Sequence, residues 1–400
     1  MHQPLPLRRR FPLLSLALAA TLTVSMARAA PDEDAVIADN GPADGPRATT
    51  FVAGFDMAWG MEFLPDGQLL VTERAGRLRV VSADGHRISA PVQGLPAVDR
   101  RDHGGLLDVI IDPDFASNRH IYVSYTEAGR GTRATRNGIA VARARLSEDG
   151  TRAEDVAVLF RQKPKVESGE NLGGRLAVSP AGELFITLGD RMLPSERVRA
   201  QNLAFLQGKT VRIRTDGSVP EDNPFAQQPG ARPEIWSLGH RNPQGVLVHP
   251  VTGELWVAEH GPQGGDEINI ARKGLNYGWP VVTFGCEYID CAPIGEGTAK
   301  PGMEPPLTHW GRPAIAPSNL IVYTGDQMPQ WKGNVFVGTL AGKALWRLEV
   351  AEEGGTTRVV RREPVFAQID ERIRDVRQGP DGALYVLTDG DRGRVVRIGL

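Results

Sequence analysis

The apolar positions of this chain fall into short alternating runs that recur in pairs. Four stretches share one pattern, two strand-like runs around a Pro-x-Gly type of turn: MEFLPDGQLLVTER (61–74), LAVSPAGELFITLGD (176–190), VLVHPVTGELWVAEH (246–260) and VRQGPDGALYVLTDG (376–390). Two looser copies lie at 109–127 and 319–340. Alternation of apolar and polar residues on both sides of a turn predicts a β-hairpin in each copy.

The six copies are spaced like the blades of a ring. The prolines that mark their turns, at positions 65, 113, 180, 250, 329 and 380, lie 48 to 79 residues apart. Each interval suits four short strands with loops of variable length. No stretch keeps a 3.6-residue apolar period, so we expect only short helices within loops such as Ser195 to Leu206. The pattern predicts an all-β fold, a six-bladed β-propeller of four-stranded antiparallel blades.

Two β-sandwiches are the competing fold, but they would explain neither the regular copies nor the lack of a linker. In a propeller, the last strand (Arg394 to Ile398) is expected to share a blade with residues from near Thr50 to Phe55. Pairing of the two chain ends closes the ring and leaves no open sheet edge.

The N-terminus has the order of a secretory signal. Three arginines (Arg8 to Arg10) precede an apolar run from Phe11 to Val24 and the small-residue site Ala27-Arg28-Ala29. We therefore predict a signal peptide at 1–29, a flexible segment at 30–49 and the propeller at 50–400, in a periplasmic or secreted protein. The run is too short for stable membrane insertion. The tripled arginine leaves the choice between Sec and twin-arginine export open.

Export changes the charge balance and the redox setting. Loss of the four arginines in residues 1–29 leaves 42 of the 46 basic residues against 48 acidic ones, a net charge of −6 that argues against a nucleic-acid partner. Cys286 and Cys291, in CEYIDC, are the only cysteines, and we expect a disulfide rather than two free thiols. A zinc site would need further ligands, and His260 and His309 are distant along the chain.

Polar, glycine-rich loops follow or precede the predicted strands, and a propeller would gather them on one face around its axis. They include RDHGG (101–105), ENLGGRL (170–176), GHRNPQG (239–245), HGPQGGDEIN (260–269) and ERIRD (371–375). These loops hold Arg175, Arg241, Arg372 and Arg374. Taken singly, each arginine is more often a structural ion-pair partner. Arg372 and Arg374, two residues apart on an extended segment, point the same way and suggest one anionic ligand.

Five motifs in combination resemble the soluble pyrroloquinoline-quinone-dependent sugar dehydrogenases, the glucose/sorbosone or aldose sugar dehydrogenase family. They are GHRNPQG, AEHGPQGGDEIN, KGLNYGWP, AIAPS, and RIRDV with the following GPDGALYVLTD. The resemblance covers about Thr50 to Ile398. It implies a six-bladed propeller that binds pyrroloquinoline quinone over the axis with Ca²⁺ and oxidises the anomeric hydroxyl of aldoses to lactones. It also implies a small sugar substrate and an electron acceptor, either the quinone pool or a cytochrome.

The resemblance implies two calcium sites. The backbone carbonyls of Gly261 and Pro262 are expected to hold the ion that touches the quinone. A second, structural ion is expected at Asp266, Glu267 and Tyr277. Carbonyl and carboxylate oxygens are the ligands that calcium prefers.

The resemblance also implies the quinone contacts. Arg241 and Asn242 are expected to bind the quinone, with Arg241 also polarising its carbonyl during the reaction. By the same resemblance, Arg372 and Arg374 would meet the quinone carboxylates, and Trp310 would line the pocket. A lysine of the family falls on Ala341, so that Lys343 would contribute only if its loop bends differently.

The expected general base departs from the family pattern. The family has a histidine three residues before the Gly-Arg-Leu of GGRL, and Asn171, which cannot accept a proton, stands there. The carboxylate that braces that histidine persists as Asp190. His103 replaces a glutamine that contacts substrate, and an imidazole with a pKa of about 6.5 suits a base. We hypothesise that His103 abstracts the proton, oriented by Asp102 or Asp190; alternatively, it only caps a backbone carbonyl.

Three functions therefore stay open. The first is an active quinone-dependent aldose dehydrogenase. The second is a diverged member that binds quinone or sugar with little turnover, which Asn171 motivates. The third is a calcium-dependent lactonase, because unrelated six-bladed propellers perform that hydrolysis with a metal-bound water. A lactonase would have no use for arginines that contact a quinone.

Overall fold

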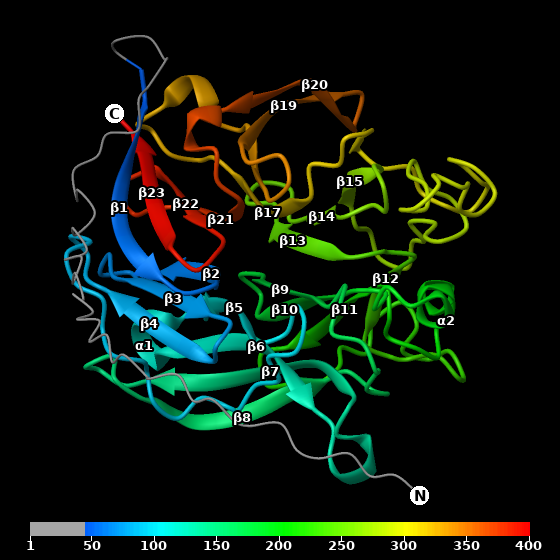
Figure 1. The fold of residues 1–400 in the computed structure, drawn as a ribbon, viewed down its shortest axis with the longest axis horizontal. Helices are drawn as coiled ribbons and strands as arrows, with labels where there is room; N and C mark the ends of the chain where they lie inside the picture. Colours follow the sequence, from blue (N-terminus) through cyan, green and yellow to red (C-terminus); the bar gives the residue numbers. More distant parts are fainter. Residues whose placement is uncertain (1–44) are drawn as a thin grey trace, which may run out of the picture. The chain divides into compact units, whose positions relative to one another are not determined.

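The chain forms a ring of six antiparallel sheets in a computed structural model that describes residues 45–400. The sheets are arranged radially (Figure 1), and their innermost strands contact one another in ring order. The six-bladed β-propeller predicted from the repeats is confirmed. The predicted signal peptide, residues 1–29, and the segment from 30 to 44 lie outside the described residues.

Within each blade the strands succeed one another from the axis outward. The first blade has β2 (Ala58–Phe63), β3 (Leu69–Glu73) and β4 (Arg77–Val81). The second has β5 (Leu106–Ile111), β6 (His120–Ala128), β7 (Asn137–Leu146) and β8 (Ala153–Arg161). The third has β9 (Gly173–Val178), β10 (Glu183–Leu188), β11 (Lys209–Arg214) and β12 (Ile235–Leu238).

The remaining three blades continue the ring. The fourth has β13 (Pro243–Val248), β14 (Leu255–Glu259), β15 (Asp266–Ile270) and β16 (Thr308–Trp310). The fifth has β17 (Pro317–Val322), β18 (Val335–Thr339), β19 (Leu345–Glu353) and β20 (Thr356–Val365). The sixth has β21 (Ile373–Gln378), β22 (Leu384–Thr388), β23 (Gly393–Gly399) and β1 (Arg47–Phe55).

The first blade departs from the four-stranded pattern, because its sheet has three strands in the described part of the chain. Beyond β4 an isolated bridge joins Val81 to Ile88. The helices are short: α1 (Phe115–Asn118), η1 (Gly131–Arg133), α2 (Pro194–Arg197), η2 (Val198–Gln201), η3 (Pro329–Trp331) and η4 (Ala367–Ile369). The two at 194–201 confirm the expected helical loop. Between residues 45 and 400, no helix has the length and hydropathy needed to cross a membrane.

Each marker proline lies between the first and second strands of its blade. In three hairpins the glycine two residues after the proline has a φ between +76° and +87° and donates its N–H, at 2.9 Å, to the carbonyl of the residue before the proline. These glycines are Gly67, Gly182 and Gly382. Glycine adopts this left-handed conformation without steric cost, which explains the Pro-x-Gly signal. The opposite ends of these strands therefore meet at the other face of the ring.

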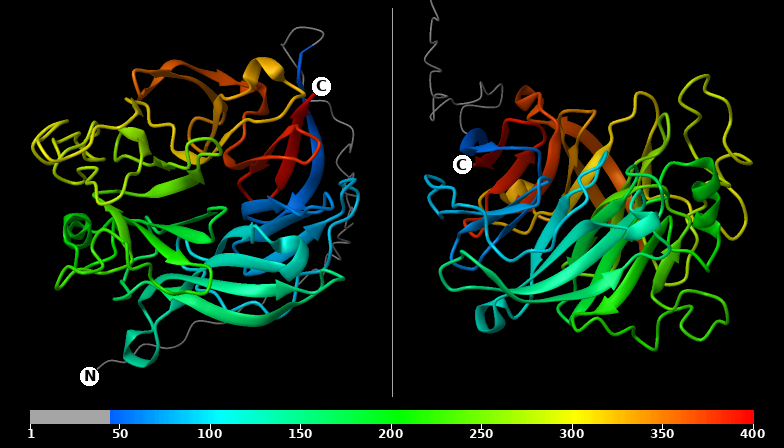
Figure 2. Two further views of the ribbon diagram at one scale, coloured as in Figure 1. Left: turned by 180° about the vertical axis from the view of Figure 1, so that it is seen from behind. Right: turned by 60° about the horizontal axis from the view of Figure 1, so that its bottom comes forward.

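The two ends of the described chain pair within the sixth blade. β1 runs antiparallel to β23, from Arg47 opposite Gly399 to Phe55 opposite Gly393. The blue and red strands lie side by side in the front and back views (Figures 1 and 2). The predicted closure is confirmed, and the strand begins at Arg47, three residues before the expected start at 50.

A buried ion-pair network ties the first strands together at the axis. Arg175 Nη1 of β9 lies 3.0 Å from Asp108 Oδ1 of β5 and 3.2 Å from Asp375 Oδ2 of β21, and all three side chains are fully buried. The guanidinium lies 4.1 Å from the Trp59 ring of β2. Hydrogen bonds from this group reach the other first strands: Asp375 accepts from Met61 N and Asn319 Nδ2, and Arg175 Nε donates to Gln244 O. Arg175 is therefore a structural partner.

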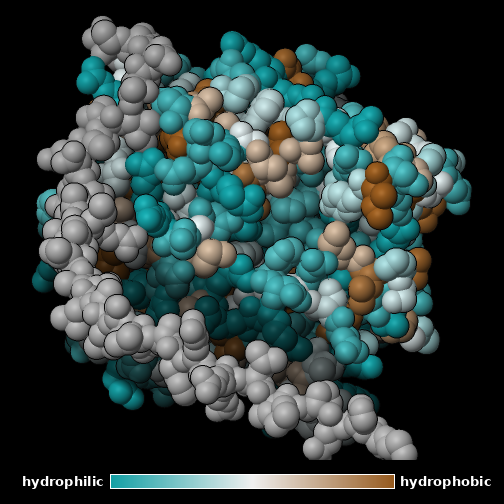
Figure 3. Space-filling model, in the orientation of Figure 1, coloured by the Kyte–Doolittle hydropathy of each residue, from teal (hydrophilic) through white to brown (hydrophobic). Residues whose placement is uncertain are grey.

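The face seen in Figure 3 is mostly hydrophilic, with only small hydrophobic patches. The large apolar side chains are instead buried between neighbouring blades, in clusters that each combine residues of adjacent sheets. This packing holds the ring rigid and leaves the loops at its axial end free to form a site.

Candidate functional site

A cavity of about 600 Å³ opens where the first strands begin and the second strands end. Every blade contributes to its wall, and its volume is that of a small-molecule site. Nine of the residues singled out in the sequence line it: His103, Asn171, Arg241, Asn242, Gly261, Pro262, Asp266, Arg372 and Arg374. The loops of distant repeats thus converge because the propeller places equivalent strand ends together.

Two arginines enter the cavity wall from the start of β21 and share one carboxylate. Arg372 Nε and Arg374 Nη2 each lie 3.1 Å from Asp389 Oδ2, just after β22. Burial disfavours the ionised form of Asp389, but the two guanidinium groups outweigh it and lower the pKa of this carboxyl. Arg374 Nε is buried and has no hydrogen-bond partner in the described chain. The two guanidinium groups and the single Asp389 carboxylate together present a net positive charge to the cavity.

Arg241 is held by contacts on several sides. Its backbone N–H donates to Glu259 Oε2 at 2.7 Å, and its Nη2 donates to the Tyr288 hydroxyl at 3.0 Å. Its Nη1 donates to the carbonyl of Gly261. The guanidinium lies 5.5 Å from the Trp279 ring and 5.7 Å from the Tyr288 ring. These contacts fix a cation on the cavity wall beside the loop expected to hold calcium.

Asp190 is buried and fully engaged by hydrogen bonds. Its Oδ1 accepts from Asn171 Nδ2 at 2.9 Å and from the N–H of Met192 at 2.8 Å. Its Oδ2 accepts from Trp279 Nε1 at 2.8 Å. The histidine that this carboxylate braces in the family is replaced by Asn171, whose amide bonds Asp190 instead. Because this bond uses Nδ2 of Asn171, its Oδ1 is the atom that can accept a hydrogen bond from a ligand.

His103 reaches the cavity from the loop before β5, and its ring is exposed to the cavity. Its backbone N–H donates to Gly169 O at 3.0 Å, whereas the imidazole forms no hydrogen bond with Asp102, Asp190 or another residue between 45 and 400. The expected orienting carboxylate is thus absent from this arrangement. Desolvation by the cavity wall lowers the pKa of His103; Glu170 opposes this shift, and Arg74 and Arg374 add to it.

The loop after β14 turns so that Gly261 and Pro262 line the cavity. A Cβ on Gly261 would lie 2.3 Å from the backbone of Gly265, so only glycine fits. Asp266 braces the loop from behind: Oδ1 accepts from Gly261 N at 2.9 Å. Its Oδ2 accepts from the backbone N–H groups of Ile315 and Ala316 at 2.7 and 2.8 Å. The structure therefore gives Asp266 a bracing role, and its role as a metal ligand stays a prediction.

Glu267 and Tyr277 lie behind this loop in a small enclosed space that Glu259 also lines. Glu259 and Glu267 are directly opposed in the β14–β15 register. Burial, and then the charge of Glu259, raise the pKa of Glu267 well above its usual range. The Tyr277 hydroxyl donates to Ile270 O and accepts from Arg272 N. Two adjacent carboxyl groups, one buried (Glu259) and one half-buried (Glu267), form an environment in which a divalent cation would stabilise the ionised forms.

Side chains alone do not make a metal centre in this range. Among residues 45–400, no group of three or more His, Cys, Asp or Glu side chains is arranged to hold an ion. An ion beside Gly261 and Pro262 would therefore rely on backbone carbonyls, the ligand type that the sequence suggested.

Two predicted quinone contacts lie away from the cavity. Trp310 belongs to β16, the outermost strand of its blade, and packs on Trp346 of the next blade with ring centroids 5.6 Å apart. Lys343 is exposed and pairs with Asp370 at 3.4 Å. Leu340 is the residue of that loop that lines the cavity. Neither residue lines the cavity in the structure, because closeness to a motif in sequence does not fix distance from the axis.

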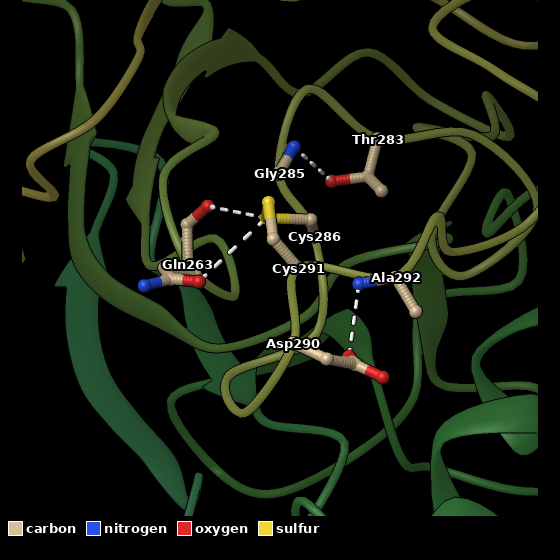
Figure 4. Close-up of a disulfide and its surroundings, with 7 residues drawn as sticks. All are labelled: Gln263, Thr283, Gly285, Cys286, Asp290, Cys291 and Ala292. Atoms are coloured by element: carbon tan, nitrogen blue, oxygen red, sulfur yellow. Dashed lines mark hydrogen bonds between the residues drawn. A yellow bond between two sulfur atoms is a disulfide. The ribbon is translucent and has the colours of Figure 1, made fainter.

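The structure joins Cys286 to Cys291 in a disulfide that closes a loop at the cavity rim (Figure 4). A backbone hydrogen bond links this loop to the loop after β14: Gln263 N donates to Cys286 O at 3.0 Å. Tyr288, inside the closed loop, reaches the cavity. No sequence pattern singles out Tyr288, since its role depends on contact with Arg241 from another segment. The sequence also did not point to Glu259, the last residue of β14, or to Asp389, the residue that follows β22.

The fold and the site define a β-propeller with a cationic, small-molecule cavity beside a carbonyl-bearing loop. Comparison with known proteins places it more closely: the chain belongs to the glucose/sorbosone dehydrogenase family, whose model matches residues 55–397. The resemblance found in the motifs is thereby confirmed.

Three relatives illustrate the match. The chain is 44% identical over 345 residues to the aldose sugar dehydrogenase YliI of Escherichia coli K12, covering 86% of this chain and 90% of that protein. The apo crystal structure of the soluble aldose sugar dehydrogenase from Escherichia coli aligns with a TM-score of 0.81 at 41% identity, over 88% and 99% of the two chains. The PQQ-bound aldose sugar dehydrogenase of Streptomyces coelicolor aligns with a TM-score of 0.68 at 25% identity, over 90% and 100%.

Proposed function

We propose that this chain is an exported quinoprotein that oxidises the anomeric hydroxyl of aldose sugars to lactones with pyrroloquinoline quinone and Ca²⁺. One observation carries the proposal: a single cavity brings together Arg241, the Arg372–Arg374 pair and the Gly261–Pro262 loop. The quinone is a planar polyanion, and guanidinium groups bind carboxylates through paired hydrogen bonds. The PQQ-bound relative supports the same cofactor.

The residues present fit both groups. Arg372 and Arg374 would hold carboxylates of the quinone, and the buried Nε of Arg374 offers an unused donor. Asn242 lines the same wall. The carbonyls of Gly261 and Pro262 would hold one calcium ion. Asp266, Glu267 and Tyr277 would hold the second, with Glu259 beside Glu267 in the β14–β15 register.

Bound quinone would supply the oxidising chemistry, because it is an acceptor for a hydride, one proton with two electrons, from the anomeric carbon. The chain supplies position, charge and a proton acceptor. Arg241, oriented through Glu259 and Tyr288, places positive charge where negative charge develops. Asn171 Oδ1 would accept a hydrogen bond from a sugar hydroxyl and so orient the ring, because its Nδ2 is committed to Asp190.

His103 would take the proton of the anomeric hydroxyl on its unprotonated ring nitrogen. It lines the same cavity as Arg241 and Asn171, and no hydrogen bond from the described residues occupies its imidazole. Its lowered pKa keeps the ring neutral, the form that accepts a proton, near neutral pH. The electrons then pass to an acceptor outside the chain, the quinone pool or a cytochrome.

The proposal is tested by mixing the purified chain with Ca²⁺ and the quinone and assaying a panel of aldoses with an artificial electron acceptor. Calcium-dependent oxidation of at least one aldose is expected. Quinone binding without turnover on any sugar would identify the diverged, binding-only member that Asn171 suggests. Lactone hydrolysis without quinone absorbance would identify the lactonase.

A further inference from the structure

The second blade carries an excess of positive charge at the end of the ring where the cavity opens. Three segments lie at that end: 99–103 before β5, 127–136 around the start of β7, and 161–170 between β8 and β9. Together they hold eight arginine and lysine residues against five aspartate and glutamate residues. The whole chain, in contrast, has 46 basic and 48 acidic residues. The proposed sugar oxidation does not use this local surplus of cations.

The surplus is concentrated in the loop between β6 and β7, residues 129–136, which we call the arginine loop. Arg130, Arg133 and Arg136 are exposed there, and Arg100 is exposed nearby. None of these four side chains forms an ion pair or a hydrogen bond with another residue between 45 and 400. Their guanidinium groups are therefore available to carboxylates of another molecule.

Two of the five acidic side chains in these segments are engaged by other cations. Asp99 pairs with Arg101. Glu127 lies 3.0 Å from Arg161 Nε and 2.6 Å from Lys165 Nζ. These carboxylates are thus already neutralised, and the arginine loop keeps its positive charge.

The arginine loop is ordered and is tied to the segment that carries His103. Gly129 N donates to Arg136 O at 2.6 Å across the base of the loop. Arg101, two residues before His103, donates from Nη1 to Thr135 O at 2.6 Å. His103 lines the cavity, and the loop projects outward from the ring (Figure 1). A molecule that docks on the loop would therefore lie beside the cavity.

The composition of the arginine loop indicates what kind of partner it fits. Its sequence, GRGTRATR, offers charge but no large apolar side chain. Binding to a lipid surface draws on buried apolar area in addition to charge. Encounter with a protein that carries surface carboxylates needs only complementary charge, and electron-transfer complexes have small, weak interfaces of this type. The loop therefore favours an acidic protein over a membrane surface.

We propose that the arginine loop and Arg100 dock an acidic redox protein that takes the electrons of sugar oxidation one at a time. The inference rests on the proposed function, because sugar oxidation supplies the electrons. Conversion of one aldose to its lactone releases two electrons and two protons. Two molecules of a one-electron acceptor, such as a haem protein, take the electrons in turn, and the protons pass to solvent.

Cytochrome c and its succinylated form test the inference, because succinylation replaces lysine cations with carboxylates on the same haem protein. The assay uses the reconstituted holoenzyme and an aldose that it oxidises with a small neutral dye. At about 20 mM salt we expect kcat/KM for the succinylated form to exceed that for the native form by at least about tenfold. The advantage should shrink to within about twofold at about 0.3 M salt, because salt screens exposed charges.

Removal of the loop cations should abolish the preference without affecting sugar oxidation. For Arg130→Gln/Arg133→Gln/Arg136→Gln we expect kcat/KM for succinylated cytochrome c to fall about tenfold at low salt, with unchanged activity toward the dye. The matched control removes three exposed arginines at the opposite end of the ring, where third strands end, and should change this value by less than about twofold. It is Arg87→Gln/Arg152→Gln/Arg214→Gln.

Calorimetric titration of the protein without quinone gives a readout independent of turnover. At low salt, the wild type and the control should bind succinylated cytochrome c with equal Kd, and the loop variant should bind at least about fivefold more weakly. Thermal unfolding confirms that each variant is folded, and Arg133→Glu alone decides the matter if the triple variant is not.

Three outcomes would contradict the account, and they are distinguishable. Absence of dye-linked oxidation of any sugar would overturn the proposed function and with it the electron-transfer role. Dye-linked oxidation with equal use of both cytochromes, or a preference that survives removal of the loop cations, would overturn the docking surface alone. Loop-dependent binding to phosphatidylglycerol vesicles, without any preference between the cytochromes, would overturn the protein partner in favour of a membrane surface.

Discussion

Asn171 and His103 line the same cavity, but only the imidazole can take a proton. Asp190 remains in place and accepts hydrogen bonds from the Asn171 amide, Met192 N and Trp279 Nε1. The carboxylate is thus kept in a satisfied site without a histidine to orient. At the scale of single residues, the chemistry depends on whether His103 has become the base.

Replacement of the proposed base should impair turnover more than binding. For His103→Gln we expect kcat to fall by about 10²- to 10⁴-fold, the usual contribution of general-base catalysis, with a smaller change in KM. His86→Gln, at an exposed turn, is the matched control. Steady-state kinetics of both reconstituted variants provide the measurement. A loss in His103→Gln no larger than that in the control would leave His103 without a catalytic role.

The pH dependence of the wild type follows from the same base. A lowered pKa keeps His103 neutral above that pKa, so kcat/KM should be full above pH 6.5 and fall as the pH drops through the lowered value. The charged groups that act on the ring are Glu170 and Asp102, which raise its pKa, and Arg74 and Arg374, which lower it. A pH–rate profile checks this. An acid limb centred above pH 6.5, or one that persists unchanged in His103→Gln, would contradict the assignment.

The position of Asn171 offers a rescue experiment. A histidine there would meet the carboxylate of Asp190, which already binds the side chain at this position. We expect the double variant His103→Gln/Asn171→His to regain at least about tenfold of the lost kcat, since a braced imidazole is restored near the substrate. Asn171→Gln in the same background, which adds no base, is the control. Equal activity of the two double variants would show that the site has no place for a base at this position.

At the scale of elements, the loop after β14 and the β14–β15 pair form the support for the expected ions. Asp266 joins the loop to the backbone at residues 315–316, and Glu259 both orients Arg241 and opposes Glu267. A charge change on this pair therefore reaches the cavity through Arg241. An ion bound at this pair would therefore be coupled to the position of the Arg241 guanidinium.

Calcium should stabilise the protein through this carboxylate pair. In the absence of calcium, desolvation and the charge of Glu259 disfavour the ionised form of Glu267, so Glu267→Gln, which is never ionised, should raise the melting temperature of the calcium-free protein. The same substitution should remove most of the increase that calcium gives the wild type. Thermal unfolding with calcium or with a chelator measures both effects, with the exposed Glu148→Gln as control. A full calcium-dependent increase in Glu267→Gln would exclude this residue as a ligand.

At the scale of the whole molecule, two devices hold the ring. β1 closes the sixth blade against β23, and the Arg175 network connects the first strands at the axis. The network lies directly beneath the cavity, where Arg175 Nη2 donates to the carbonyl of Arg374 at 3.0 Å. The stability of the ring and the position of a cavity arginine are therefore linked.

Removal of the axial cation should destabilise the protein strongly. Arg175→Met leaves Asp108 and Asp375 buried without their main partner, and loss of one member of a buried ion pair costs about 3–5 kcal/mol. Arg214→Met, at the exposed end of β11, should change the free energy of unfolding by less than about 0.5 kcal/mol. Urea unfolding of the two variants gives the comparison. Equal stabilities would mean that the network contributes little to the ring.

The sequence predicted the ring because its signals are local. Each Pro-x-Gly turn reports one hairpin, and the ring then brings strand ends such as Arg241 and Arg372 into one cavity. Tyr288, Glu259 and Asp389 were not predicted, because their roles arise from contacts between segments far apart in the chain. Trp310 and Lys343 do not line the cavity, since sequence provides no measure of distance from the axis.

Our central claim is that this cavity holds a quinone and a calcium ion for sugar oxidation. Its most direct test is reconstitution of the purified chain with pyrroloquinoline quinone, with and without Ca²⁺, followed by dye-linked oxidation of an aldose panel. We predict stoichiometric quinone binding, aldose oxidation only when calcium is present, and loss of quinone binding in Arg372→Ala/Arg374→Ala, the variant that removes the paired cations. No quinone binding by the folded wild-type chain in the presence of calcium would contradict the claim.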